Sequence, residues 1–129
     1  MTTAGEGATV LVIEDEEPLM RATCQRLSRL NFNSLQATTG QAALDFVGNP
    51  STPIDVVLLD MRLPDIDGDR LFHKMRALRP DLKIVLCSGY AIDEPVKTLL
   101  NQGAYGFLQK PFSLATLSEK LKETISPCG

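Results

Sequence analysis

The sequence predicts an α/β domain in which an open parallel sheet carries helices on both faces. Four short apolar runs support this fold: 10–13, 56–59, 84–87 and the weaker 107–108. Runs without alternation are typical of strands buried on both faces, as in a parallel sheet. The segment Asn33–Ala37 alternates between apolar and polar residues, which favours a strand at the edge of the sheet. Segments with helical periodicity separate these runs, so strand and helix alternate five times.

The expected helices show apolar residues at spacings of three and four, which places them on one helical face. The sets on the first, third and last helices are Met20, Cys24 and Leu27; Leu71, Met75 and Leu78; and Leu114, Leu117, Leu121 and Ile125. Four helical segments are preceded by residues suited to capping a helix N-terminus: Thr39, Asp67, Asp93 and Ser113. Gly103 is expected to end the helix that starts at Pro95.

Length and composition favour one domain, which we assign to 9–126, with a flexible lead (1–8) and a tail (127–129). The formal net charge of −3 provides no basic field for a phosphate backbone, so we expect no DNA binding by this chain. No apolar run approaches the ~18 residues of a membrane span, and the first residues lack the apolar core of a signal peptide. The three cysteines form no zinc or redox motif, as is typical of reduced thiols. We therefore expect a cytoplasmic domain that does not bind membranes.

Polar residues stand where the expected strands end. The first strand ends at Glu14 and Asp15, the third at Asp60, the fourth at Ser88 and the fifth at Lys110. Each residue alone has an ordinary structural explanation, such as an acidic helix N-terminus, a turn hydroxyl or a surface lysine. Parallel strands present their carboxyl ends at one edge of the sheet, where ligands bind. A common site therefore explains all five residues better than five separate structural roles.

Three carboxylates gathered at one edge favour a bound cation. Two unit charges ~4 Å apart repel by about 4 kcal/mol at an effective dielectric constant of 20. Glu14, Asp15 and Asp60 together with Lys110 carry a net charge of −2, which a divalent ion neutralises. Hard oxygen ligands in small number favour Mg²⁺, which shares its coordination shell with water and phosphate.

The segments that hold these residues resemble a known family. Four of them are similar, in order and spacing, to the signatures of response-regulator receiver domains of two-component signalling: VLVIEDE (10–16), VLLDMRLPDIDG (57–68), CSGY (87–90) and FLQKPF (107–112). The resemblance covers about 9–125, nearly the whole chain. It implies a flavodoxin-like doubly wound fold with five helices and five parallel strands in the order 2-1-3-4-5.

The resemblance also implies roles for the site residues. Asp60 is expected to accept a phosphoryl group from a phosphohistidine of a histidine kinase or histidine phosphotransfer domain. Mg²⁺ is expected to bind to Glu14, Asp15, Asp60 and the backbone carbonyl of Arg62. Lys110 is expected to pair with Asp60 first and with a phosphoryl oxygen afterwards. Glu14 stands where the family more often has aspartate, which lengthens one metal-binding side chain.

Further implied roles concern the response to phosphorylation. Ser88 is the expected switch hydroxyl, and Phe107, in place of the more frequent tyrosine, is the switch aromatic that follows it inward. Arg62 and Tyr90 are expected to flank the path of an attacking water, and because both are large we expect slow loss of the phosphoryl group. Such a domain catalyses only its own phosphorylation and dephosphorylation, so we do not class it as an enzyme.

Two other functions remain open at this point. A haloacid dehalogenase-type phosphohydrolase needs a second aspartate two residues past its nucleophile, but position 62 is arginine. A pseudo-receiver that binds partners without phosphorylation usually lacks the acceptor, the acidic pair or the lysine, and all are present here. The chain is expected to be a single-domain regulator or part of a longer protein. The segments 88–91 and 107–112 look more like receivers attached to hybrid sensor histidine kinases.

Overall fold

The computed structural model describes residues 7–125. In this part of the chain five strands alternate with five helices: β1 (Thr9–Ile13), α1 (Glu17–Arg29), β2 (Asn33–Ala37), α2 (Gly40–Val47), β3 (Val56–Asp60), α3 (Gly68–Leu78), β4 (Ile84–Ser88), α4 (Glu94–Asn101), β5 (Gly106–Gln109) and α5 (Leu114–Ile125). The strands form one parallel sheet in the order β2-β1-β3-β4-β5, which confirms the predicted fold. Most of the expected lead (1–8) and the whole expected tail (127–129) lie outside the described residues.

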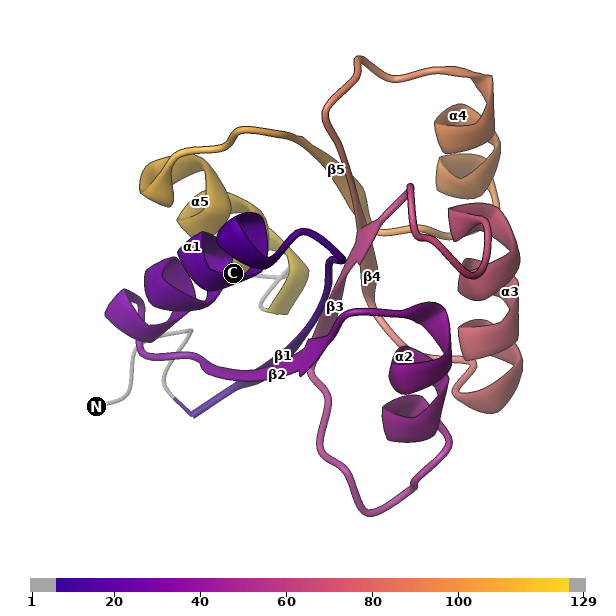
Figure 1. Ribbon diagram of the computed structural model, residues 1–129, viewed down its shortest axis with the longest axis horizontal. Coiled ribbons are helices and arrows are strands. Elements are labelled where there is room, and N and C mark those ends of the chain that lie inside the picture. Colours follow the sequence, from indigo (N-terminus) through magenta and orange to yellow (C-terminus); the bar gives the residue numbers. More distant parts are fainter. Residues whose placement is uncertain (1–6, 126–129) are drawn as a thin grey trace.

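The sheet carries a layer of helices on each face (Figure 1). Helices α1 and α5 cover one face, and α2, α3 and α4 cover the other. Successive residues of a strand point to opposite faces. Val10 and Val12 therefore pack toward α1 and α5, whereas Leu11 and Ile13 pack toward the other three helices. This burial on both faces explains the continuous apolar runs, while β2, at the sheet edge, is only partly buried.

The central strand β3 has polar residues at both ends and apolar residues between them. Before the strand, Asp55 Oδ2 accepts a hydrogen bond of 2.7 Å from Thr9 N, and Asp55 N donates one of 2.8 Å to Thr9 O. Val10 then pairs with Val56 as β1 and β3 run side by side. The strand ends at Asp60, and every residue in it is buried.

The predicted helix ends are largely confirmed. Three predicted caps accept hydrogen bonds of 3.1 Å from backbone N–H groups: Thr39 from Ala42, Asp93 from Val96 and Ser113 from Thr116. Gly103 follows α4 with φ +107°, the left-handed conformation that ends many helices. Asp67 stands at the N-cap position of α3, but its side chain accepts no capping hydrogen bond, so this part of the prediction is wrong. The backbone of Asp67 pairs instead with Arg62 in an isolated antiparallel bridge.

The predicted apolar face of α3 is wrong at one residue. Leu71 and Met75 are buried as expected, but Leu78 is 52% exposed, and Phe72 takes a buried place that was not predicted. Leu78 is the last residue of α3, and the chain leaves the helix at Arg79 in an extended conformation. Helical spacing predicts the direction of a side chain but not how far the core extends along the helix axis.

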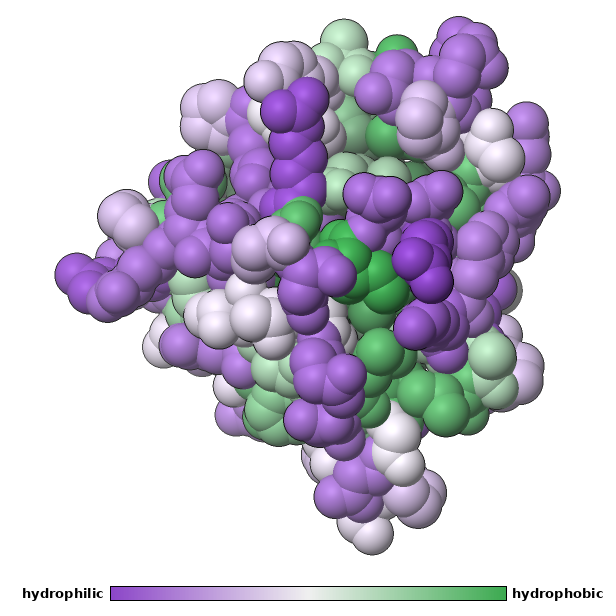
Figure 2. All heavy atoms as spheres, turned by 45° about the vertical axis from the view of Figure 1, so that its right-hand side comes forward, coloured by the Kyte–Doolittle hydropathy of each residue, from purple (hydrophilic) through white to green (hydrophobic). Residues whose placement is uncertain are grey.

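The face formed by α2, α3 and α4 comes forward in Figure 2, where apolar atoms lie among a mostly hydrophilic surface. The partly buried apolar residues that pack on this side of the core include Leu44, Phe46, Leu63 and Ile66. Within residues 7–125, no helix has the length and apolar character needed to cross a membrane.

Candidate functional site

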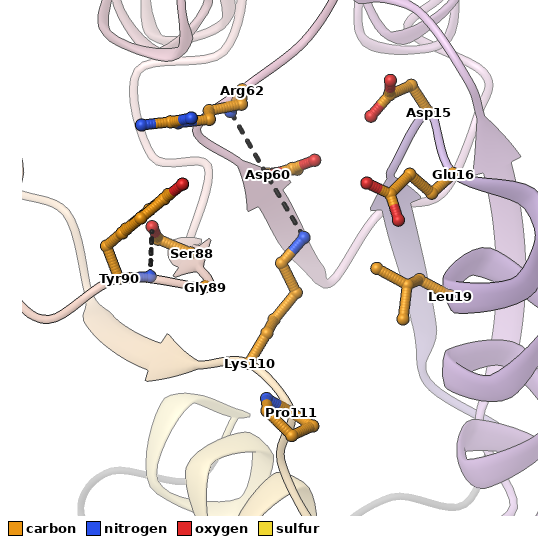
Figure 3. A pocket seen from close by; sticks show the side chains of 10 residues that line it. All are labelled: Asp15, Glu16, Leu19, Asp60, Arg62, Ser88, Gly89, Tyr90, Lys110 and Pro111. Atoms are coloured by element: carbon orange, nitrogen blue, oxygen red, sulfur yellow. Dashed lines mark hydrogen bonds and ion pairs between the residues drawn. The ribbon is translucent and has the colours of Figure 1, made fainter.

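The carboxyl ends of the strands surround a cleft of about 370 Å³ (Figure 3). All the predicted site residues except Glu14 and Phe107 line it; the complete lining is Asp15, Glu16, Leu19, Asp60, Arg62, Ser88, Gly89, Tyr90, Lys110 and Pro111. Glu14 lines a smaller neighbouring cavity together with Asp60 and Lys110. Phe107 is half-buried in β5 and packs against the core on the side of α3 and α4. Leu19 was not expected at the site, and nothing in the sequence marks it apart from the other apolar residues of α1.

Backbone hydrogen bonds between neighbouring strands hold the polar residues in place. Just after Asp60, Met61 N donates to Cys87 O at 3.0 Å, which fixes the end of β3 against β4. Lys110 N donates to Ser88 O at 2.7 Å, which aligns the lysine with the predicted switch residue. These contacts follow from the parallel pairing, so the sheet itself brings together residues that are far apart in the sequence.

Three carboxylates form a cluster that suits a divalent metal ion. One oxygen from each of Glu14, Asp15 and Asp60 lies within 4.8 Å of the others. Glu14 and Asp60 are each only 5% exposed, whereas Asp15 faces solvent. Hard oxygen donors of this number and charge match the preference of Mg²⁺, which also keeps water in its shell. The predicted metal-binding side chains therefore lie together.

Lys110 contacts two of these carboxylates. Its Nζ lies 2.7 Å from Glu14 Oε1 and 3.3 Å from Asp60 Oδ1, so the expected pairing with Asp60 is shared with Glu14. The second oxygen of Glu14, Oε2, accepts a hydrogen bond of 3.2 Å from Glu16 N. Both carboxylate oxygens of Glu14 therefore accept hydrogen bonds.

The surroundings shift the pKa of both central groups. Burial raises the pKa of Asp60 to about 6, against the opposing effects of the Lys110 charge and the hydrogen bond from Arg62 N. Burial acts to lower the pKa of Lys110, but the hydrogen bond to Glu14 and the charges of both carboxylates outweigh it and raise the pKa. The site therefore holds a charged lysine beside a carboxylate whose pKa lies well above its ordinary value.

Arg62 and Tyr90 close one side of the cleft. Arg62 Cζ lies 4.2 Å from the centroid of the Tyr90 ring, a cation–π contact between two exposed side chains. Tyr90 N donates to Ser88 Oγ at 3.1 Å, so the tyrosine and the buried serine are linked (Figure 3). The predicted pair thus lies together beside Asp60, and the contact between its members adds a feature that the sequence did not show.

Comparisons with known proteins agree with this arrangement. The chain is 34% identical over 118 residues to the sensor kinase CckA of Brucella abortus, a match that covers 92% of this chain and 12% of that protein. The chain spans less than a third of the length of CckA and of other curated relatives. Among solved structures, a CheY-like receiver domain from Methanospirillum hungatei is 30% identical with a TM-score of 0.87, covering 95% of this chain and 96% of that one.

A second structure is similar over much of its length. It is a response regulator from Burkholderia pseudomallei with a phosphorylated aspartic acid, calcium ion and citrate, 25% identical with a TM-score of 0.80. The match covers 94% of this chain and 70% of that one. The family model of the response regulator receiver domain matches residues 10–122 of the sequence. This range includes the whole sheet except Thr9 and every residue of the acidic cleft. On this evidence the chain belongs to the response regulator receiver domain family.

Proposed function

We propose that Asp60 accepts a phosphoryl group from a phosphohistidine of a histidine kinase or histidine phosphotransfer domain. One observation carries this proposal: a buried carboxylate ends the central strand, with a lysine ammonium 3.3 Å from its Oδ1 and two further carboxylates in the same cluster. An Asp60 oxygen attacks phosphorus, the bond between phosphorus and the histidine nitrogen breaks, and the nitrogen keeps the electron pair. Lys110 offsets negative charge beside the reacting oxygens.

Glu14, Asp15, Asp60 and the Arg62 backbone carbonyl are the proposed ligands of Mg²⁺. When bound, the ion neutralises charge on the phosphoryl oxygens. The cluster of three carboxylates supports this assignment. The related response regulator from B. pseudomallei, with its phosphorylated aspartic acid and calcium ion, supports both an aspartate acceptor and a divalent cation here.

Ser88 and Phe107 are the proposed switch residues. The Ser88 hydroxyl is buried and its oxygen already accepts a hydrogen bond from Tyr90 N, so its proton can be donated to a phosphoryl oxygen on Asp60. Phe107 lies one strand position after Gly106, on β5 beside β4, and is half-buried. A shift of Ser88 toward the phosphoryl group leaves space that the Phe107 ring fills, which changes the surface around β5.

The wider setting of the domain is also a proposal. Similarity to the sensor kinase CckA, of which the chain spans 12%, supports a receiver joined to a histidine kinase in one longer protein. The donor is then a phosphohistidine of that same protein or of a separate phosphotransfer domain. A cytoplasmic location is part of the same proposal.

Mapping of the phosphoryl group tests the proposed function. With acetyl phosphate and Mg²⁺, the parent is expected to take up one phosphoryl group per chain, located at Asp60 and released by hydroxylamine as an acyl phosphate. Asp60→Asn is expected to take up none. The matched control is Asp69→Asn, the same change at an exposed carboxylate on α3, and it should be labelled like the parent. Undiminished labelling of Asp60→Asn would refute the acceptor, and an unlabelled parent would favour the pseudo-receiver.

A further inference from the structure

The loop between β3 and α3, residues 61–67, is closed at its base. Arg62 and Asp67 pair across it as an antiparallel bridge. The chain also approaches itself closely there: a Cβ added at Gly68 would lie 2.8 Å from Met61 Cα and 2.9 Å from Met61 O. Only glycine fits this approach without displacing backbone atoms. The two ends of the loop are therefore held close together beside Asp60.

The tip of this loop is fastened to the N-terminus of α2, which lies beside it (Figure 1). Asp65 Oδ1 accepts a hydrogen bond of 2.9 Å from Gly40 N, and Asp65 Oδ2 accepts one of 3.1 Å from Gln41 N. Ile66 packs directly over Gly40, where an added Cβ would collide with Ile66 Cγ2. One carboxylate and one apolar side chain thus join two segments that are 25 residues apart in the sequence.

The contact adds to the cap that α2 receives from its own segment, because Asp65 binds two N–H groups that Thr39 leaves free. The helix already has a cap from its own segment, because Thr39 Oγ1 accepts from Ala42 N at 3.1 Å. Asp65 is exposed, and the hydrogen bonds from Gly40 and then from Gln41 hold its pKa below the ordinary value. Asp65 is therefore charged at neutral pH and bound to backbone donors, which favours a fixed link between loop and helix.

The other end of the same loop reaches the acceptor. Arg62 N donates to Asp60 Oδ1 at 3.2 Å, and the Arg62 carbonyl is a proposed ligand of Mg²⁺. Only Leu63 and Pro64 separate Arg62 from Asp65, and the proline ring fixes one backbone torsion angle between them. The fastened tip and the backbone beside Asp60 are thus joined by a short connection with one rigid link.

We infer that Asp65 is a positioning residue for the phosphoacceptor site: by joining the 61–67 loop to α2, it holds the Arg62 backbone where it contacts Asp60 and offers its carbonyl to Mg²⁺. The metal part of this inference rests on the proposed function. The part that concerns the loop stands on the hydrogen bonds of Asp65 and Arg62 alone.

A comparison of Asp65→Ala with Thr39→Ala tests the inference. Both variants remove side-chain acceptors at the start of α2, but only the first releases the loop. Asp65→Ala is expected to weaken Mg²⁺ binding, measured by calorimetry, by about tenfold. Thr39→Ala is expected to lower the unfolding midpoint while keeping the parent's Mg²⁺ affinity. Asp65→Asn, which keeps one acceptor oxygen, should lie between the parent and Asp65→Ala.

Hydrogen exchange of the Arg62 amide, followed by NMR without Mg²⁺, gives a second readout. Asp65→Ala is expected to speed this exchange roughly tenfold relative to the parent, and Thr39→Ala to leave it unchanged. Equal Mg²⁺ affinity in Asp65→Ala and the parent, or equal effects of the Asp65 and Thr39 variants, would overturn the inference. If the parent itself fails to bind Mg²⁺, the proposed metal site is refuted, and the exchange rates decide the role of Asp65 alone.

Discussion

Replacing Asp60 with asparagine is expected to stabilise the domain at neutral pH in the absence of Mg²⁺. The pKa of Asp60 is about 6 in the folded protein, above its ordinary value of 3.8, mainly because the group is buried. The folded state therefore binds this proton more tightly than the unfolded chain does, so ionisation opposes folding. Stability falls as the pH rises from about 4 to 6, and above that range the full cost of about 3 kcal/mol is present.

Asparagine removes the charge but not the whole cost of burial. An amide must still be desolvated, and the ion pair with Lys110 is lost, although Lys110 keeps its contact with Glu14. Allowing for these losses, we expect the free energy of unfolding to rise by about 1–2 kcal/mol at pH 7. The difference between variant and parent should shrink as the pH is lowered toward 4, because Asp60 in the parent then becomes protonated.

Urea unfolding followed by circular dichroism, with a chelator present, measures this difference at pH 7 and pH 4.5. Asp15→Asn is the matched control, since it makes the same change at an exposed carboxylate of the same cluster, and its effect should stay within about 0.5 kcal/mol. A lower free energy of unfolding for Asp60→Asn at pH 7 would refute the reasoning. So would a gain of equal size at both pH values.

Four further substitutions probe the remaining roles. Ser88→Ala is expected to accept phosphate but to lose the change in hydrogen exchange around Phe107 on adding beryllofluoride; a response like the parent's would remove Ser88 from the switch. Arg62→Asn and Tyr90→Ala are each expected to speed phosphate release several-fold by opening one side of the cleft, and unchanged decay in both would show that they do not gate water. Asp15→Asn is expected to weaken Mg²⁺ binding about tenfold in calorimetry, or about 1.4 kcal/mol; unchanged affinity would exclude it as a ligand.

The fold could be predicted because each strand and helix carries its own local signal. Apolar runs placed four strands to within two residues of the observed ends, and alternation placed β2 at the sheet edge. Leu78 was predicted wrongly because periodicity says nothing about where the core stops along a helix. Asp67 was predicted to cap α3, but its side chain accepts no capping hydrogen bond. Its backbone pairs with Arg62 instead, and this contact depends on how the loop closes, which no local pattern encodes.

The site was predictable for a different reason: parallel topology gathers the residues that follow each strand. The sequence could not show which partner each side chain contacts once these residues lie together. Lys110 contacts Glu14 more closely than Asp60, and this choice depends on the length of one side chain and on the space around it. The contact between Asp65 and α2 could not be predicted, because an aspartate in a turn segment has no distinguishing local pattern.

The polar ends of β3 have a consequence for how the chain finds its pairing during folding. The strand is apolar toward both helical layers, so sliding it by one residue against β1 would exchange one buried valine or leucine for another at little cost in burial. Hydrophobicity alone therefore cannot select the correct alignment. Polar contacts at the two ends of the strand select the alignment instead. Asp55 binds the Thr9 backbone at one end, and Asp60 pairs with Lys110 at the other. Asp60 therefore helps to set the alignment of the strand that carries it, apart from its proposed role in the cleft.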